Sequence, residues 1–142
     1  MKLAVASDHA GFEKKQVVLK YLKEQGIEYK DFGTYSSESC DYPDFAHPMA
    51  EAVSTGEFDK GISLCGSGNG INITANKHAG IRSAICWLPE IASLARLHND
   101  ANICALPARY ISDNEAIEIV KTFLETGFEG GRHLIRINKI PL

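Results

Sequence analysis

The sequence predicts one domain of the α/β class, a Rossmann-like three-layer α/β/α arrangement around a five-stranded parallel sheet. Short apolar runs alternate along the chain with segments whose apolar residues recur at helical spacing. The connections between successive runs are too long for hairpins, which favours parallel strands joined by right-handed crossovers. The 142 residues, 44% of them hydrophobic, suit a single domain over 1–142.

No repeat, low-complexity tract or linker divides the chain. Strands are expected at residues 2–7, 27–32, 61–65, 82–87 and 102–106. Helices are expected at residues 13–23, 45–53, 71–77, 89–98 and 116–124. Pro48 leaves the start of the second helix open, whereas Ser112 and Glu115 have the spacing of a capping box before the last one. Residues 34–44 are expected to form an exposed loop.

Composition excludes several classes of protein. A formal net charge of −3 gives no basic field, so we expect neither nucleic acid nor a membrane surface as a partner. The apolar run at residues 3–6 is too short for a signal peptide, and no later stretch could span a bilayer. The four cysteines are widely spaced, without a CxxC pair. This favours a reducing cytoplasm and predicts neither disulfides nor a metal site.

Ligands of open parallel sheets bind beyond the carboxyl ends of the strands, so the loops after the first, third, fourth and fifth strands are the places to search. Unusual residues follow two of them, at 7–11 and at 65–70. Residues 98–100, at the end of the helix after the fourth strand, are a third such segment. We expect all three to contribute to one site at one edge of the sheet.

The run Cys65-Gly66-Ser67-Gly68-Asn69-Gly70 joins a predicted strand to a predicted helix. Free backbone N–H groups at a helix start bind anions, and glycines let an anion come close. Ile71 excludes three familiar motifs, because a Walker A loop requires Lys there, a dinucleotide loop Gly and a phosphatase loop Arg. A tight turn without a ligand remains the structural alternative.

The other candidates also have ordinary structural explanations. Cys65 could be a buried thiol at a strand end or a thiolate activated at a helix start. His98 continues the apolar stripe of its helix, and could be a core or C-capping residue. Asp8 and His9 could belong to a helix cap. The convergence of three segments on one edge is what favours a functional site.

Two arginines near the C-terminus suit a phosphate group. Arg132 and Arg136 follow Gly130-Gly131 and share a face if the segment is helical. Arginine can bind phosphate with two parallel hydrogen bonds. A solvated basic tail is the alternative, but the hydrophobic residues among the arginines indicate that residues 128–142 dock on another surface, such as a partner subunit.

Together these groups suit an aldose–ketose isomerase that acts on a sugar phosphate without a cofactor. Cys65 would move a proton between neighbouring carbons, and the N–H groups of residues 66–70 would stabilise the enediolate. His98 would open the sugar ring. The phosphate would be held by basic side chains, namely His9, Arg132 and Arg136.

The sequence closely resembles the sugar-phosphate isomerase family of ribose 5-phosphate isomerase B, which also holds allose 6-phosphate and galactose 6-phosphate isomerases. The resemblance covers essentially the whole chain and rests on SDHAGF at 7–12, SxxxxDYPDFA at 37–46, CGSGNGI at 65–71, ANKHAGIR at 75–82, RLHNDAN at 96–102 and FEGGRHLIRI at 128–137. It implies Cys65 as proton acceptor and His98 as ring-opening donor. The substrate-binding residues it implies are Asp8, His9, Gly66, Ser67, Gly68, Asn69, Gly70, Asn99, Arg109, Arg132 and Arg136.

The resemblance also implies a homodimer or dimer of dimers with shared active sites, and the pentose phosphate pathway as the setting. In a second branch of the family a glutamate just after the glycine loop is the base, whereas this chain has Cys65 and Ile71. Ser67 stands where the family also uses threonine. We expect ribose 5-phosphate and ribulose 5-phosphate as the reactants. The alternatives are a hexose 6-phosphate and, from another class, a non-enzymatic flavodoxin-like domain that binds a nucleotide or flavin.

Overall fold

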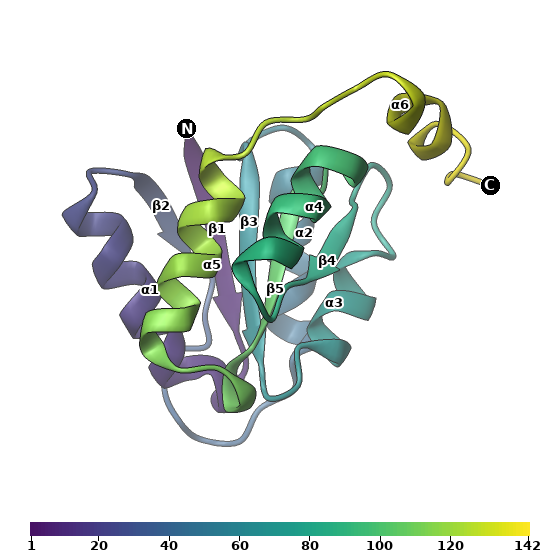
Figure 1. Cartoon of the computed structure of the whole chain (residues 1–142). Helices are drawn as coiled ribbons and strands as arrows, with labels where there is room; N and C mark the ends of the chain where they lie inside the picture. Colours follow the sequence, from purple (N-terminus) through teal and green to yellow (C-terminus); the bar gives the residue numbers. More distant parts are fainter.

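The computed structural model describes residues 1–142 and contains a central sheet of five strands that all run in the same direction (Figure 1). The strands are β1 (Lys2–Ser7), β2 (Glu28–Asp31), β3 (Lys60–Cys65), β4 (Ser83–Ile85) and β5 (Ile103–Pro107). They are arranged in the order β2-β1-β3-β5-β4. The predicted fold class, a three-layer α/β/α structure with a five-stranded parallel sheet, is confirmed.

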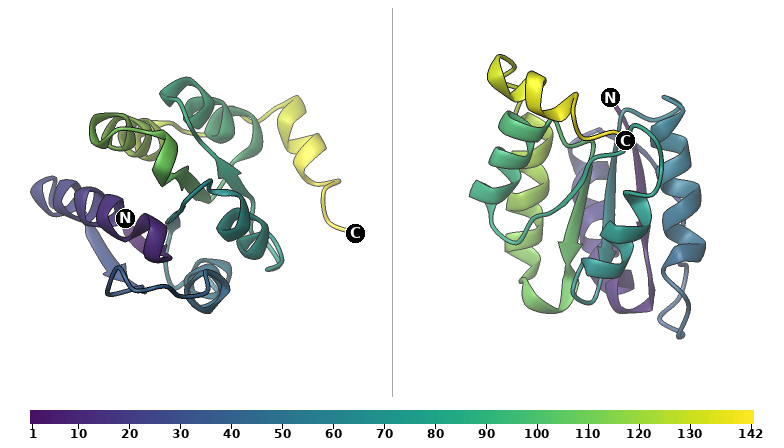
Figure 2. Two further views of the ribbon diagram at one scale, coloured as in Figure 1. Left: turned by 90° about the horizontal axis from the view of Figure 1, so that it is seen from below. Right: turned by 90° about the vertical axis from the view of Figure 1, so that its right-hand side faces the viewer.

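Helices cover both faces of the sheet (Figure 2). The helices are α1 (Phe12–Glu24), α2 (Pro43–Ser54), α3 (Asn69–Ala75), α4 (Pro89–Asn99), α5 (Asp113–Glu125) and α6 (Arg132–Ile137), with short 3₁₀ helices η1 (His9–Gly11) and η2 (Ala108–Tyr110). Helices α1, α4 and α5 lie on one face, and α2 and α3 on the other. Helix α6 extends away from the sheet on the far side of α4 (Figure 1). None of the helices has the length and apolar character needed to cross a membrane.

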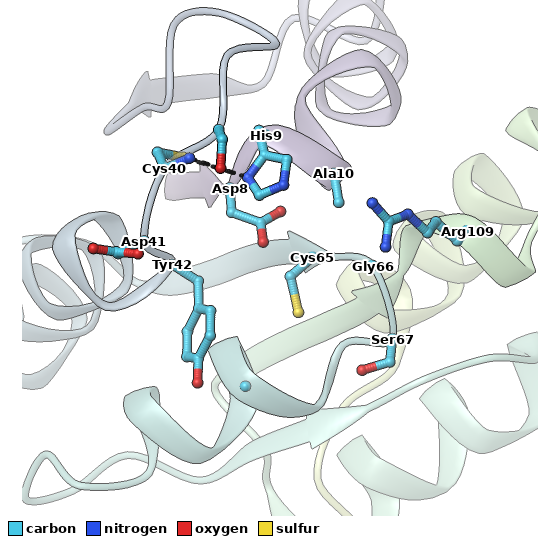
Figure 3. A pocket seen from close by; sticks show the side chains of 12 residues that line it. Asp8, His9, Ala10, Cys40, Asp41, Tyr42, Cys65, Gly66, Ser67 and Arg109 are labelled. Carbon is cyan, nitrogen blue, oxygen red and sulfur yellow. Dashed lines mark hydrogen bonds between the residues drawn. The ribbon is translucent and has the colours of Figure 1, made fainter.

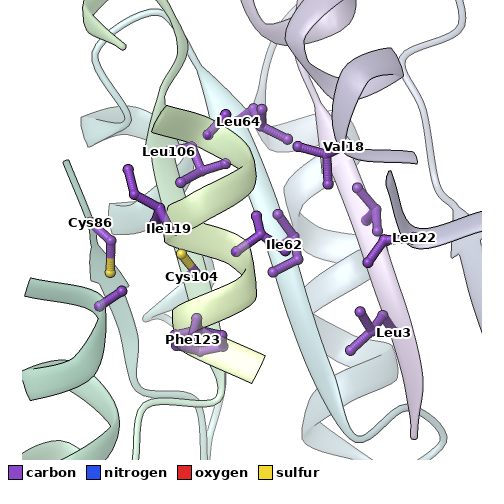
Figure 4. Packing of buried hydrophobic residues seen from close by; sticks show 14 of the residues in the cluster. Leu3, Val18, Leu22, Ile62, Leu64, Cys86, Cys104, Leu106, Ile119 and Phe123 are labelled. Carbon is purple, nitrogen blue, oxygen red and sulfur yellow. The ribbon is translucent and has the colours of Figure 1, made fainter. Parts of the chain in front are cut away.

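The three central strands, β1, β3 and β5, are largely apolar because both of their faces are buried, whereas the edge strand β2 is polar and partly exposed. In β1, Leu3 and Val5 point toward α1 and α5 and are fully buried, whereas the alternate residues Ala4 and Ala6 pack toward α2. Figure 4 shows the larger of these two cores, where side chains of the central strands meet α1 and α5. This two-sided burial explains why continuous apolar runs, rather than alternating ones, predicted the strands.

The observed bounds of some elements differ from the predicted ones, because local chemistry outweighs the apolar pattern there. Strand β4 comprises only residues 83–85 rather than 82–87, because Trp87 is already half exposed beyond the sheet edge. Helix α2 begins at Pro43, a favourable first position for proline, and accommodates Pro48 inside it. The predicted capping box is confirmed: the Ser112 Oγ accepts from the Glu115 N–H at 3.1 Å, and the Glu115 carboxylate accepts from the Ser112 N–H at 2.9 Å.

One buried ion pair fixes the end of β2 beside the end of β1. Lys15 of α1 is fully buried, and its Nζ donates to the Asp31 Oδ1 at 2.5 Å and to the Thr34 carbonyl at 2.6 Å. Burial lowers the pKa of Lys15, and the carboxylate of Asp31 opposes that shift. The Ser7 N–H donates to the Gly33 carbonyl at 2.7 Å, and the Thr34 N–H donates to the Ser7 carbonyl at 2.7 Å. The pair therefore holds in place the segment that borders Asp8.

Replacing Lys15 by Met tests this pair. We expect the free energy of unfolding to fall by roughly 2–4 kcal/mol, because removing one partner leaves Asp31 and the Thr34 carbonyl without their cation. Asp31 is 25% exposed, and water therefore limits the penalty. Urea unfolding followed by circular dichroism measures the change.

The neighbouring Lys14→Met is the matched control, because Lys14 pairs at 2.8 Å with Asp113, whose side chain is 64% exposed. An exposed pair of this kind contributes about 0–1 kcal/mol. Equal losses in the two variants would contradict the role assigned to Lys15.

Candidate active site

A polar cavity of about 520 Å³ opens at the carboxyl edge of the sheet (Figure 3). Residues from four separate segments line it: Asp8, His9, Ala10, Ser39, Cys40, Asp41, Tyr42, Cys65, Gly66, Ser67, Gly70 and Arg109. The segments follow β1, β2, β3 and β5, as expected for a site beyond the carboxyl ends of parallel strands. The structure brings together seven of the predicted site residues here, namely Asp8, His9, Cys65, Gly66, Ser67, Gly70 and Arg109.

Cys65 is the last residue of β3 and is 5% exposed. Its backbone is held in register with Pro107 of β5, and it packs against Ala46, Ile71 and Ala105. In Figure 3 the thiol projects from the strand end into the cavity, between the side chains of Tyr42 and Ser67. The sheet and the small apolar cluster thus hold one face of the thiol, while its other face meets the cavity.

The glycine loop leaves backbone donors free. The N–H groups of Gly66, Ser67 and Gly68 make no hydrogen bond within the chain, and that of Asn69 reaches only the Ser67 Oγ, at 3.3 Å. Free donors next to a thiol suit a negative charge that develops near it. Gly68 and Asn69 belong to the loop but do not line the cavity.

Two glycines of the loop permit close approaches. A Cβ at Gly70 would lie 2.5 Å from the ring of Tyr42, so only glycine lets that ring cover the loop. A Cβ at Gly66 would lie 3.0 Å from the Nη1 of Arg109, and the backbone N–H of Arg109 donates to the Gly66 carbonyl at 3.1 Å. The loop is therefore in contact with an aromatic ring on one side and a guanidinium on the other.

Asp8 and His9 present different groups to the cavity. Asp8 is 7% exposed and caps η1, since its Oδ1 accepts from the Gly11 N–H at 3.1 Å. Asp8 therefore caps a helix, as its structural alternative predicted, and also forms part of the cavity wall. The Nδ1 of His9 accepts from the Cys40 N–H at 3.2 Å. A neutral His9 then carries its proton on Nε2, which leaves that N–H free to donate to a ligand.

Residues 39–42 line the cavity although the sequence analysis assigned them to an exposed loop. They follow β2, which ends at the same edge as the other strands. The rule that places ligands beyond the carboxyl ends of strands would have included this loop. The contact from Cys40 to His9 joins residues 31 apart in the sequence, and no local pattern encodes it.

The sequence predicted that His98 and Asn99 lie at the same edge of the sheet as Cys65, which is wrong for a single chain. Helix α4 returns antiparallel to β4, so its C-terminal end lies at the amino edge of the sheet, opposite the cavity (Figure 1). Arg132 and Arg136 of α6 lie near that end of α4. These four predicted site residues therefore form a second group, separated from Cys65 by the length of the sheet.

His98 stacks on His133 in this second group. The ring centroids are 4.3 Å apart, with 13° between the ring planes. The Glu129 Oε2 lies 3.9 Å from the His98 Nε2 and 3.7 Å from the His133 Nε2. Burial and the adjacent His98 ring lower the pKa of His133, while Glu129 acts in the opposite direction. Neither Glu129 nor His133 was assigned a role from the sequence.

The same three residues are the chain's one cluster with the composition of a metal site, and their ligand atoms lie within 4.8 Å of one another. The geometry does not suit a metal ion. An imidazole binds a metal in the plane of its ring, and nearly parallel stacked planes do not converge on one ion. Arg132 and Arg136 add positive charge beside the cluster.

A parallel α/β sheet with a thiol under a loop of free N–H groups defines a class of protein, an enzyme whose site binds a small anionic metabolite. Comparison with known proteins gives the family. The chain belongs to the Ribose/Galactose Isomerase family, whose model matches residues 3–140.

Individual relatives are similar over nearly their full length. Ribose-5-phosphate isomerase B of Escherichia coli is 46% identical over 139 residues, which cover 98% of this chain and 93% of that protein. The crystal structure of the Thermotoga maritima ribose 5-phosphate isomerase has a TM-score of 0.96 at 54% identity, covering 98% of this chain and 96% of that one. The Mycoplasma genitalium ribose-5-phosphate isomerase B, solved with bound ribulose 5-phosphate, has a TM-score of 0.94 at 40% identity, covering 98% and 93%.

Proposed function

We propose that this protein is an aldose–ketose isomerase that interconverts ribose 5-phosphate and ribulose 5-phosphate. The observation that carries the proposal is the thiol of Cys65 in the cavity wall, followed by the unpaired N–H groups of Gly66 and Ser67, which line the same cavity. The E. coli ribose-5-phosphate isomerase B relative and the M. genitalium enzyme with bound ribulose 5-phosphate support the choice of substrate.

The proposed reaction transfers two protons and needs no external oxidant or reductant. The Cys65 thiolate removes the proton from C2 of the open-chain aldose, and the electron pair of that bond forms the C1–C2 double bond of an enediolate. The thiol then returns the proton to C1, while the hydroxyl proton on O2 passes to O1, which leaves the carbonyl at C2. The unpaired N–H groups of Gly66 and Ser67, which line the cavity, stabilise the negative oxygen of the intermediate.

Binding of the phosphate completes the proposal. His9 and Arg109 line the cavity and supply donors within one chain. Arg132 and Arg136, with His98 and Asn99, lie at the opposite edge and can serve this cavity only from another copy of the chain. We therefore propose a homodimer, or a dimer of dimers, in which the partner brings its α4 end and α6 to the cavity. The predicted roles of Asp8, Gly68, Asn69 and Gly70 in substrate binding belong to the same proposal.

Exposed apolar residues support docking of the C-terminal segment on a partner. Leu134, Ile135 and Ile140 are 47%, 62% and 58% exposed, and α6 projects from the domain (Figure 2). A segment that leaves so much apolar surface in water gains stability when a second subunit covers it. The arginines of α6 then reach a second cavity as part of the same contact.

Turnover assays test the substrate. We expect the protein expressed alone to isomerise ribose 5-phosphate with a much higher kcat/KM than allose 6-phosphate or galactose 6-phosphate. A preference for either hexose phosphate would overturn the substrate assignment. A purified protein that carries a bound nucleotide or flavin and turns over none of these sugars would instead favour the non-enzymatic alternative.

Replacing Cys65 by Ala tests the proton carrier. Loss of a positioned base lowers kcat by roughly 10²–10⁴-fold, whereas the fold is retained because Cys65 is held in the sheet by the backbone pairing of β3 with β5. Steady-state kinetics and thermal unfolding measure the two effects. Cys40→Ala is the control, because Cys40 lines the same cavity from a different segment. A loss below about tenfold in Cys65→Ala would rule out this role.

Mixing two inactive variants tests the shared site. In a heterodimer of Cys65→Ala and His98→Asn chains, one shared site carries both substitutions and the other carries neither. A 1:1 mixture after subunit exchange should recover about a quarter of the wild-type activity if partners pair at random in a symmetric dimer. Native mass spectrometry verifies the exchange. Formation of heterodimers without recovery would show that each chain supplies its own His98.

A further inference from the structure

We infer that the side of α4 that faces the open edge of the sheet is the contact between two copies of this chain, packed antiparallel about a two-fold axis. The inference rests on the proposed function, in which His98, Arg132 and Arg136 come from a second copy. It adds to that function the surface that brings them to the cavity, and the register of the two chains at that surface.

Helix α4 has two apolar faces. One is buried against the sheet and α5 through Ala92 and Ala95. Ile91 and Leu94 share a different face, which continues to His98 near the end of the helix. Leu94 is 37% exposed, and the side chain of His98 is 42% exposed. Because the outer side of a surface helix is normally polar, this second face is one that its own chain leaves uncovered.

The second face points past β4, the edge strand on that side of the sheet. Arg96 points toward α5, since its Nε donates at 3.1 Å to the carbonyl of Thr126 at the end of that helix. Residues two positions apart on a helix point in nearly opposite directions. Leu94 and His98, on either side of Arg96, therefore point away from α5. There His98 stacks on His133 of α6, which projects beyond the same edge (Figure 1).

The spacing of the residues along this edge is palindromic. Trp87, just before the helix, is 50% exposed. Ile91, Leu94 and His98 follow it at intervals of four, three and four residues. Intervals of three and four are those of closely packed helix pairs. Because the order reads the same from either end, an antiparallel copy of α4 meets this face in register. Ile91 of each chain then lies against Leu94 of the other, and each Trp87 lies beside the partner's His98.

This register brings the separated site residues together. Trp87 lines a pocket of about 590 Å³ together with Ser67 and Asn69 of the glycine loop. Ser67 also lines the cavity that holds Cys65. The partner's His98, placed beside Trp87, is therefore next to the loop that follows Cys65. The two-fold axis turns the partner's sheet end for end, so the partner's amino edge and its α6 lie at this carboxyl edge.

Pairing of strands, the alternative contact at this edge, is blocked. The side-chain amide of Asn76 donates to the Ser83 carbonyl at 2.9 Å and accepts from the Ser83 N–H at 2.8 Å. Ser83 is the first of only three residues in β4, so a partner's strand finds little free backbone there. The contact between copies is therefore carried by helices rather than by a continuous sheet.

Leu94→Arg tests the contact. Leu94 is exposed in the single chain, so the fold is retained, whereas a guanidinium placed against the partner's Ile91 opposes association. Sedimentation analysis should show a monomer at concentrations where the unchanged protein is a dimer. The kcat/KM on ribose 5-phosphate should fall by roughly 10²-fold or more, because no His98 reaches a cavity. Circular dichroism verifies the fold.

Ile73→Arg is the matched control, because Ile73 is an exposed apolar residue of α3, on the other face of the sheet. It should leave both the dimer and the activity unchanged. Equal dissociation by the two substitutions would overturn the assignment of the contact to α4.

Trp87 is the single tryptophan and reports the contact directly. Dilution of the unchanged protein until the dimer dissociates should move its fluorescence to longer wavelengths, because the indole ring becomes exposed to water. Leu94→Arg should show the shifted spectrum at every concentration. Identical spectra for monomer and dimer would overturn the placement of Trp87 against the partner.

Engineered cysteines test the register. Ile91→Cys chains, mixed 1:1 with Leu94→Cys chains and oxidised by oxygen with copper phenanthroline, should form an interchain disulfide that mass spectrometry locates between positions 91 and 94. Each variant alone should form much less of it, because each position faces the other across the contact. More self-linking of Leu94→Cys alone than linking in the mixture would overturn the register.

Oligomeric state and activity together separate this inference from the proposed function. The expected Leu94→Arg protein is a folded monomer with little activity. A Leu94→Arg protein that remains dimeric would overturn the α4 contact, whatever its activity, and would leave the proposed function standing. A monomer with unchanged activity would support the contact and overturn the shared active site.

Discussion

The common direction of the five strands is the constraint from which the rest of this structure follows. Every loop that leaves a strand lies at one edge of the sheet, and every helix that returns to the next strand ends at the other. Cys65 ends a strand and His98 lies near the end of a returning helix, so the fold separates them. A site that uses both residues has to be assembled from two chains, whatever the details of its chemistry.

The same constraint explains what the sequence could and could not predict. Buried parallel strands are continuous apolar runs, so β1, β3 and β5 were predicted within one residue of their bounds, and residues 65–70 were assigned to the correct edge. The error at His98 was one of topology: in the predicted parallel sheet, a helix that follows one strand and leads to the next must end at the edge opposite the strand ends, and residues 98–100 were assigned without that rule. Tyr42 and Cys40 escaped notice because their contacts with Gly70 and His9 join distant parts of the chain.

Two buried basic side chains, Lys15 and His133, differ in the acceptors that surround them. Lys15 is fully buried and receives both a carboxylate and a carbonyl as acceptors, which is how an interior tolerates a cation. His133 is nearly as buried, but its Nε2 has no acceptor within hydrogen-bonding distance. The first group serves as a charged anchor for the chain beside Asp8. The second is stable as a neutral ring, because burial lowers the pKa of His133.

The glycine loop fits a short-lived anion better than a permanent one. A phosphate carries its charge in every state of the reaction, and binding it tightly through the loop would stabilise substrate and transition state alike. An enediolate oxygen becomes negative only during proton transfer, so donors aimed at it lower the barrier selectively. The N–H groups of Gly66 and Ser67 line the cavity and are unpaired before any substrate arrives, so they need no reorganisation when that charge forms. In the proposed reaction the permanent charge of the phosphate is left to arginine side chains, which lie at both edges of the sheet and would come from two subunits of the proposed dimer.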